Sequence, residues 1–444
     1  MKLEEMLERL KPKITWKICL KDTAKTVYRQ IEKTYFETVT KEACRMEVRD
    51  FYELAASATI AGLTDALLED SKRLFSDDLF LESRKHGIGF VNGIFDLRSG
   101  KMRKYQTSDF VCDALPHKLP WHLNRDIDAW FVNILKQWVG EETGEWFMNL
   151  LAYLLFLYPN GENIWVNFFG SGANGKSVCL ELLERILGEK KCIGCDLKNI
   201  NRFSGDTFKD KWLVLGRDSS PVVSDNATSF IKTFSGDPKF LVERKGGASF
   251  DTMNQGKLIV STNSLIQSKD RSYAWYRRLF PILFPNKFDR NEPFKYELFQ
   301  RTPEIIRCLL HRAYQYRHTE TSLFKSIPEP VIELMRETRM LNDRVAAFWE
   351  HYFFKEIETP TLQTVLDWDK LRSLHGLTMS QVYAQYCWWH EQEFGDIQVE
   401  PGLRTFGGPY GAFLQSEAQK YFSYHKTRAG RVVELKENFR EAFK

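Results

Sequence analysis

One stretch of the sequence decides the fold: Gly170-Ser171-Gly172-Ala173-Asn174-Gly175-Lys176-Ser177. It matches G-x-x-x-x-G-K-S completely, and its glycines let the backbone curl so that successive N–H groups face phosphate oxygens. Such a loop ends at a helix N-terminus, where the helix dipole favours anions. We therefore expect Lys176 to reach the β- and γ-phosphates of ATP, and the Ser177 hydroxyl to coordinate Mg²⁺.

The residues on either side of this loop fit the motif. Residues 164–169 are typical of a buried strand, and the residues after the loop have the periodicity of an amphipathic helix that Gly188 can end. The apolar positions of this helix are Cys179, Leu182, Leu183, Ile186 and Leu187. The alternative, a glycine-rich turn with a surface lysine, would not be expected between a strand and a helix.

Two further apolar segments end in polar residues. Residues 212–215 lead to Asp218, a candidate carboxylate for Mg²⁺. Residues 258–262 lead to Asn263, whose amide can hydrogen-bond the γ-phosphate or orient the attacking water. The alternatives are a solvated strand end for Asp218 and a turn former for Asn263. The order of loop, acid and amide at similar intervals favours the catalytic interpretation.

An arginine pair, Arg277 and Arg278, precedes the apolar residues 279–284. An arginine from a neighbouring subunit can stabilise the charge that develops during phosphoryl transfer. One member of the pair is therefore a candidate arginine finger. For the other member, a surface residue capping a strand is an equally good interpretation.

Charge and composition set wide limits. The 444 residues include 63 Lys and Arg against 59 Asp and Glu, and the net charge of +4 does not by itself indicate nucleic acid. We expect a cytoplasmic protein with no membrane partner, because the N-terminus lacks a secretory signal. The apolar run 147–158 is shorter than the ~20 residues that cross a bilayer and predicts a buried helix. Cys192 and Cys195 have no second pair nearby, so free thiols are favoured over a zinc site.

Together the motifs resemble the superfamily 3 helicases of the phage and plasmid primase-helicase type, to which the poxvirus helicase-primase is related. The resemblance is specific between about residues 160 and 285. Besides the phosphate-binding loop it is carried by residues 213–218, 232–238 (Lys-Thr-Phe-Ser-Gly-Asp-Pro), 261–263 and 277–279. Outside this core, residues 92–97 and 383–435 more weakly resemble the motif before the ATPase and the winged-helix region after it.

The resemblance implies an α/β fold of the AAA+ type and a hexamer with ATP between subunits. It also implies single-stranded DNA in a central pore, contacted by a β-hairpin that follows the metal acid. Residues 243–250 occupy the place of that hairpin, so Arg244 and Lys245, assisted by Lys239, are candidate phosphate contacts. Without the family, this segment is only a basic turn between two short strands.

Two departures from the pattern limit the assignment. Asp218 stands between Arg217 and Ser219, so no second acid adjoins it and the general base is unassigned. We also find no zinc ribbon or primase acid cluster before the ATPase, so any priming is expected to come from a separate primase or polymerase.

We expect three domains. An N-terminal domain at residues 1–125 should be mostly helical to about residue 85, with a small β element near residues 87–112. The AAA+-type P-loop ATPase core with its parallel sheet should span residues 126–300, and its last part, 286–300, is a polar stretch that separates it from later helices. Residues 301–444 should form helices and a winged-helix-like DNA-binding domain.

The predicted C-terminal domain contains a candidate recognition helix at residues 411–420 and a hairpin at residues 421–435. The hairpin carries Lys426, Arg428 and Arg431, which suit phosphate contacts along duplex DNA. A solvated hairpin that closes the domain is the alternative.

Three functions are compatible with these observations. We favour an ATP-dependent replicative helicase that assembles as a ring and translocates on single-stranded or forked DNA during replication of a mobile element. The second is an initiator that binds origin duplex DNA through its C-terminal region and uses ATP for assembly. The third is a P-loop phosphotransferase acting on a small molecule, which would need neither the basic hairpin nor a trans arginine.

Overall fold

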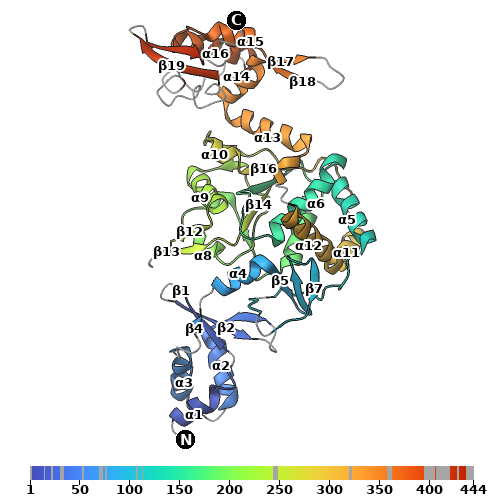
Figure 1. The fold of residues 1–444 in the computed structure, drawn as a ribbon, viewed down its shortest axis with the longest axis vertical. Helices are drawn as coiled ribbons and strands as arrows, with labels where there is room; N and C mark the ends of the chain where they lie inside the picture. Colours follow the sequence, from blue (N-terminus) through green and yellow to red (C-terminus); the bar gives the residue numbers. More distant parts are fainter. Residues whose placement is uncertain are drawn as a thin grey trace. The chain divides into compact units, whose positions relative to one another are not determined.

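A five-stranded parallel sheet carries the phosphate-binding loop in this computed structural model (Figure 1), in the order β16-β8-β14-β10-β9. The strands are β8 (Trp165–Phe169), β9 (Cys192–Cys195), β10 (Leu213–Gly216), β14 (Lys257–Thr262) and β16 (Leu279–Leu283). β10 and β14 are buried along their whole length, as expected for parallel strands covered on both faces. The predicted parallel α/β core is confirmed.

Helices and short segments complete this core. They are α5 (Arg125–Val139), α6 (Glu141–Phe156), α7 (Lys176–Leu187), η2 (Leu197–Asn199), α8 (Ser204–Phe208), β11 (Val222–Val223), α9 (Asp225–Gly236), α11 (Glu292–Gln300) and α12 (Thr302–His318). The predicted apolar stripe of α7 is buried, and Gly188 ends the helix with φ 76°. α6 is buried from Thr143 to Phe156 except for the exposed Glu145 and the half-buried Asn149, so the predicted buried helix is confirmed.

The N-terminal region combines helices with a sheet, which corrects the prediction of a mostly helical segment. Its elements are α1 (Leu3–Leu10), β1 (Trp16–Lys21), β2 (Ala24–Gln30), β3 (Phe36–Val39), α2 (Lys41–Phe51), α3 (Ser57–Glu69), β4 (Leu74–Phe75) and α4 (Asp78–His86). The sheet order is β3-β2-β1-β4. β1 and β2 pair antiparallel, from Trp16 opposite Arg29 to Lys21 opposite Ala24. Both strands are short and contain Lys, so the stronger helical periodicity of α2 and α3 dominated the sequence pattern.

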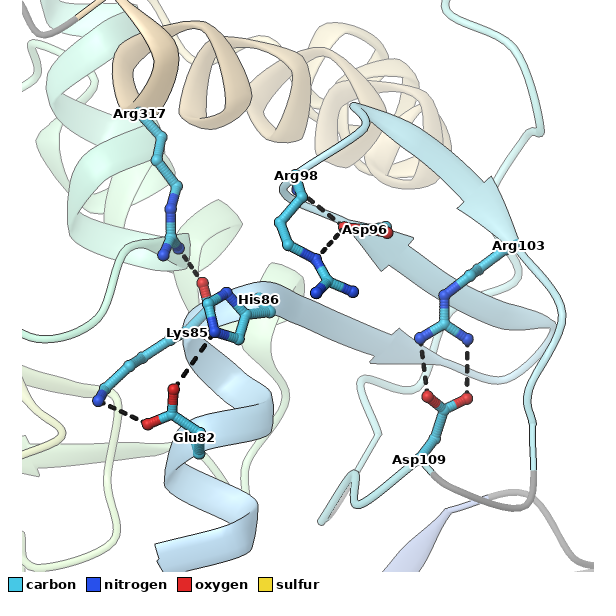
Figure 2. A network of polar contacts seen from close by, with 8 residues as sticks. All are labelled: Glu82, Lys85, His86, Asp96, Arg98, Arg103, Asp109 and Arg317. Carbon is cyan, nitrogen blue, oxygen red and sulfur yellow. Dashed lines mark hydrogen bonds and ion pairs between the residues drawn. The ribbon is translucent and has the colours of Figure 1, made fainter.

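The predicted small β element is present as an antiparallel sheet of β5 (Gly87–Phe90), β6 (Gly93–Asp96) and β7 (Lys101–Arg103). Figure 2 shows the polar contacts that hold it. Arg103 donates two hydrogen bonds to Asp109, at 2.7 and 2.8 Å. Arg317 of α12 donates to the Lys85 carbonyl at the end of α4. The Arg317 contact joins the end of α4 to a helix of the core.

Arg84 in α4 reaches the amino ends of two core strands. Its guanidinium donates to the backbone and side-chain oxygens of Gln255, at 3.2 and 3.0 Å, and lies 3.8 Å from the centre of the Trp212 ring. Gln255 precedes β14, and Trp212 precedes β10. Burial lowers the pKa of Arg84 to about 9. The strands that lead to Asn263 and Asp218 are thus held at their opposite ends by the N-terminal region.

The chain divides into two compact units. The first comprises residues 1–265 and 277–332, and the second comprises residues 266–276 and 333–444. Its elements are β15 (Gln267–Ser268), α10 (Tyr273–Tyr276), α14 (Arg344–Phe353), β17 (Phe354–Ile357), β18 (Gln363–Leu366), α15 (Trp368–Leu374), α16 (Met379–Phe394), β19 (Phe422–Thr427) and β20 (Gly430–Leu435). Before it come η3 (Leu323–Ser326) and α13 (Glu329–Asn342), in which the division between the units falls. Phe348 of α14 and the α16 residues Tyr386 and Trp389 are buried in its core, whereas Trp388 of α16 is exposed.

The structure describes residues 3–14, 16–21, 24–30, 35–52, 55–69, 74–75, 78–106, 109–112, 114–243, 249–319, 323–357, 363–394, 406, 421–427 and 430–436. Within these residues, none of the helices has the length and apolar character needed to cross a bilayer. The expected division into domains at residues 1–125, 126–300 and 301–444 differs from the two compact units and stays a prediction.

Candidate functional site

A cavity of about 1040 Å³ opens at the phosphate-binding loop. The predicted residues that line it are Gly172, Ala173, Asn174, Gly175, Lys176, Ser177, Asp218 and Asn263. Gly170 and Ser171 begin the loop but do not line the cavity. Three segments far apart in the sequence therefore meet around one space, at the carboxyl ends of β8, β10 and β14.

Lys176 is held in place by neutral oxygens. Its Nζ donates to the Gly170 carbonyl, to Asn174 Oδ1 at 3.1 Å and to Asn263 Oδ1 at 3.5 Å. The side chain is buried, and this burial lowers the pKa of Lys176, while the nearby Asp218 carboxylate raises it again. The sequence motif thus folds into a loop that points a desolvated ammonium group at the cavity.

The glycines of the loop are required by its shape. Gly175 has φ 90°, and a Cβ there would lie 2.9 Å from the buried Trp138 ring of α5. Gly172 has φ 99° with open space around it. The backbone can therefore turn sharply and present N–H groups to the cavity, the arrangement that phosphates require. These features fit a bound nucleotide triphosphate.

The strand order explains why Asp218 and Asn263 meet Lys176. β14 lies between β8 and β10, so its carboxyl end lies between the phosphate-binding loop and Asp218. Asp218 has φ 42°, a left-handed conformation that is costly outside glycine and clusters at functional sites. The Ser219 N–H then donates a hydrogen bond to the Ser261 carbonyl at 2.9 Å, which holds this segment against the end of β14. Ser177 and Asp218, both on the cavity wall, carry side-chain oxygens of the kind that Mg²⁺ prefers as ligands.

Two buried polar residues, Asn167 and Thr262, hold the turn that carries Asn263. Asn167 in β8 is fully buried, and its Nδ2 donates to Thr262 Oγ1 at 2.9 Å and to the Val260 carbonyl at 3.2 Å. The Thr262 hydroxyl in turn donates to the Ser264 carbonyl at 2.7 Å. The turn that presents Asn263 is therefore fixed on both sides by hydrogen bonds.

Sequence reasoning missed one wall of the cavity. Residues 288–295, predicted to be only a polar separator, line it together with Gln137 and Trp138. The Phe288 N–H donates to the Ala173 carbonyl at 2.7 Å, and Asn286 Nδ2 donates to the Gln137 carbonyl at 2.7 Å. No motif marks this wall, because backbone hydrogen bonds position it.

Arg277 and Arg278 lie at the amino ends of the parallel strands, whereas the cavity lies at their carboxyl ends. β16 pairs in parallel with β8 so that Leu279 aligns with Trp165, whereas the loop follows Phe169 at the other end. At ~3.3 Å per residue, a strand of five residues separates its amino end from its carboxyl end by about 17 Å. Arg278 is half-buried against Gly236, where no room is left for a Cβ, and burial lowers the pKa of Arg278. Arg277 is exposed.

The predicted basic hairpin is present as β12 (Lys239–Val242) and β13 (Phe250–Met253), paired antiparallel. Its tip, with Arg244 and Lys245, lies outside the described residues, and Lys239 is exposed on β12. The hairpin packs against α8: a Cβ on Gly205 would lie 3.0 Å from the Phe240 ring.

Sequence reasoning also missed basic and aromatic side chains next to this hairpin. Phe203 is 37% exposed, with the Arg202 guanidinium 4.7 Å above its ring. Arg202 also pairs with Glu243 at 3.5 Å, and Lys209 lies 5.6 Å from the Phe250 ring centre. An exposed ring beside cations is typical of surfaces on which nucleic-acid bases stack.

The C-terminal hairpin predicted at residues 421–435 is present as β19 and β20, with Lys426 paired to Arg431 in register. Arg428 and the candidate recognition helix at residues 411–420 lie outside the described residues. Cys192 and Cys195 are the first and last residues of β9, where burial raises the pKa of each thiol to about 12. Both cysteines therefore remain protonated at neutral pH.

Comparisons with known proteins find distant relatives. Residues 168–278 match a family model described as a family of unknown function, DUF5906. A protein of Acanthamoeba polyphaga mimivirus, whose name, helicase L207/L206, is itself provisional, is 29% identical over 219 residues. The match covers 47% of this chain and 22% of that protein, so this chain spans about a fifth of its viral relative. The chain is thus distantly related to a viral helicase-like protein.

Among solved structures, two apo structures of the NrS-1 C-terminal region share this fold. Each has a TM-score of 0.51 at 12% identity, and covers 97% of this chain and 98% of the NrS-1 chain. At this identity the likeness concerns the fold alone.

Proposed function

We propose that this protein is an ATP-driven DNA helicase of superfamily 3 that works as a ring, most simply a hexamer, in the replication of a mobile element. The observation that carries the proposal is the one cavity lined by Lys176, Asp218 and Asn263. The provisional name of the mimivirus relative agrees with it.

In this proposal, the triphosphate of ATP binds along the loop N–H groups with Lys176 beside its β- and γ-phosphates. Ser177 and Asp218 would hold Mg²⁺, which would neutralise charge on the phosphate oxygens. Asn263, presented by its hydrogen-bonded turn, orients the attacking water or the γ-phosphate. These residues act by positioning and charge stabilisation, which is most of what phosphoryl transfer requires.

The arginine pair divides into two roles. Arg277 is exposed at the sheet edge about 17 Å from its own phosphate-binding loop. It is therefore better placed to reach the nucleotide of a neighbouring subunit than its own. Arg278 packs against Gly236 and supports the start of β16. We assign Arg277 as the trans arginine and Arg278 as its structural support.

The DNA contact in this proposal is the hairpin surface: the β12–β13 hairpin with Lys239, Arg244 and Lys245, and the neighbouring Arg202 and Phe203. Basic groups there would bind strand phosphates, and the exposed Phe203 ring offers a stacking face for a base. An ATP-driven shift of this surface would pull the strand.

Replacing the loop lysine tests the proposal. Lys176→Ala should lower ATP hydrolysis by about 10²- to 10³-fold, because the fixed positive charge at the developing phosphate charge is lost. Unwinding of a forked duplex should disappear with it. The exposed Lys104 outside the cavity provides a matched control, and Lys104→Ala should leave both activities unchanged. Phosphate release and strand-displacement gels measure the two activities.

Two results would contradict the proposal. Lys176→Ala could retain hydrolysis, which would remove the nucleotide site from this cavity. Alternatively, the unaltered protein could hydrolyse ATP yet never displace a strand, which would favour the initiator or phosphotransferase interpretations.

A further inference from the structure

The cavity at the phosphate-binding loop extends well beyond the loop itself. Its volume of about 1040 Å³ equals or exceeds that of most small-molecule sites. A triphosphate along residues 172–177 leaves the space between residues 288–295 and the end of α5 for a base and ribose. The chemistry of that wall should therefore match a nucleobase.

Among the aromatic side chains that line the cavity, where Phe294 is half-buried, Phe288 is the most exposed. It is 38% exposed and lines the cavity, whereas Trp138 is only 3% exposed and packs against Gly175. Within the described residues, no other ring and no cation packs on the Phe288 ring. An uncovered phenyl face on a cavity wall gains free energy when an apolar or aromatic surface covers it.

The backbone holds Phe288 in place before any ligand arrives. The segment 284–288 runs alongside the loop: the Phe284 carbonyl accepts a hydrogen bond from Asn174 Nδ2 at 3.0 Å, and the Phe288 N–H donates to the Ala173 carbonyl at 2.7 Å. Between them, Asn286 anchors the segment to the end of α5. The loop that binds phosphates therefore also sets the position of the ring, and little ordering is needed on binding.

The two cations on this wall, Arg290 and Lys295, are already paired with carboxylates. Arg290 pairs with Glu292 at 2.7 Å, and Lys295 pairs with Glu181 at 2.7 Å. A second cluster of phosphate-binding charges is therefore not offered on this wall. A flat, uncharged ring system fits the space better than another anion.

We propose that Phe288 is the stacking platform for the nucleobase of the bound nucleotide, a role that rests on the nucleotide site proposed above. The triphosphate lies on the loop, and the base lies face to face with the phenyl ring. Base–aromatic stacking of this kind changes affinity by about 10- to 100-fold when the ring is removed.

Paired ligands separate the platform from the phosphate site. ATP and inorganic tripolyphosphate, each with Mg²⁺, share the phosphates but only ATP has a base. Calorimetry on the full-length chain should show Phe288→Ala weakening ATP by about 10- to 100-fold while tripolyphosphate affinity stays within twofold. Phe288→Tyr, which keeps the stacking face, should restore most ATP affinity. Phe51→Ala, which removes a ring that is 41% exposed in α2, is the matched control and should change neither ligand.

Each other outcome overturns the platform in a distinguishable way. Equal ATP affinity of Phe288→Ala and the unaltered protein means that the base lies elsewhere. An equal loss of ATP and tripolyphosphate means that Phe288 only supports the loop. If the unaltered protein binds neither ligand, the nucleotide site itself is wrong and the platform falls with it.

Discussion

Lys176 is the buried charge around which the site is organised. The residue as a whole is only 4% exposed, and burial lowers the pKa of Lys176 from its usual value. Desolvation of an ammonium group costs free energy, which the three oxygens on Gly170, Asn174 and Asn263 offset in part. A phosphate brought to Nζ would offset more of this cost. The same burial that disfavours the charge therefore strengthens the attraction for a polyphosphate.

The arginine pair yields a prediction at the scale of single residues. Arg277→Ala should lower kcat for ATP hydrolysis by about 10³-fold, since a trans arginine stabilises charge in the transition state. Arg278→Ala should instead lower the unfolding temperature, because the guanidinium packs on Gly236 and Asp237 lies nearby. Steady-state hydrolysis and thermal unfolding distinguish the two effects.

Mixing variants provides the control for the trans assignment. A Lys176→Ala subunit supplies an intact Arg277, and an Arg277→Ala subunit supplies an intact loop. Hydrolysis should reappear when the two inactive proteins are combined, because some boundaries then hold both groups. If no activity returns, or if Arg278→Ala is as inactive as Arg277→Ala, the assignment is wrong.

The candidate site residues that could be predicted from the sequence are those in segments that follow an apolar strand. Lys176, Asp218 and Asn263 each follow an apolar segment, and parallel strands bring their carboxyl ends to one edge. Phe288 and Trp138 could not be found in this way. Phe288 lies in a polar stretch after the last strand, and Trp138 resembles any apolar position of an amphipathic helix. Their place depends on backbone hydrogen bonds and packing, which leave no periodic pattern.

Among the elements, the β12–β13 hairpin is the one through which ATP hydrolysis would move the DNA strand in the proposed function. Lys245→Ala should abolish unwinding of forked DNA while DNA-independent hydrolysis continues. The slope of log Kd against log salt for single-stranded DNA should fall by about 0.7, the value for one lost phosphate contact. Strand displacement and salt titrations of DNA binding measure these effects, with Lys104→Ala again as the control. Intact unwinding by Lys245→Ala would remove the hairpin from the DNA path.

The elements differ in how well the sequence predicted them. The sequence predicted the elements β8, α7, β10, β14 and β16. In this region apolar runs typical of buried strands alternate with helical segments whose apolar residues recur on the buried face. The sheet of β1–β4 was missed, since its strands are short and the neighbouring helices have the stronger periodicity.

In the molecule as a whole, one compact unit contains the phosphate-binding loop, Arg277 and the β12–β13 hairpin. The expected nucleotide site and DNA contact therefore belong to the same unit. The C-terminal winged helix stays a prediction: β19 and β20 match its expected wing, whereas residues 411–420 lie outside the described chain. Sequence patterns identify packing units best where helices and strands alternate regularly, and the C-terminal region lacks such alternation.

The distance between Arg277 and its own loop leads to a prediction about assembly. If Arg277 acts in trans as proposed, a complete hydrolytic site needs two copies of the chain, because about 17 Å separates these groups within one copy. Turnover per subunit should therefore rise with protein concentration and level off as sedimentation velocity shows a monomer giving way to an oligomer. A non-hydrolysable ATP analogue and forked DNA should shift both curves to lower concentration, since a ligand bound at a subunit boundary stabilises that boundary. Electron microscopy of the plateau species should show a closed ring. Constant turnover from a species that sediments as a monomer at every concentration would mean that one chain completes its own site, and the trans arginine would have no role.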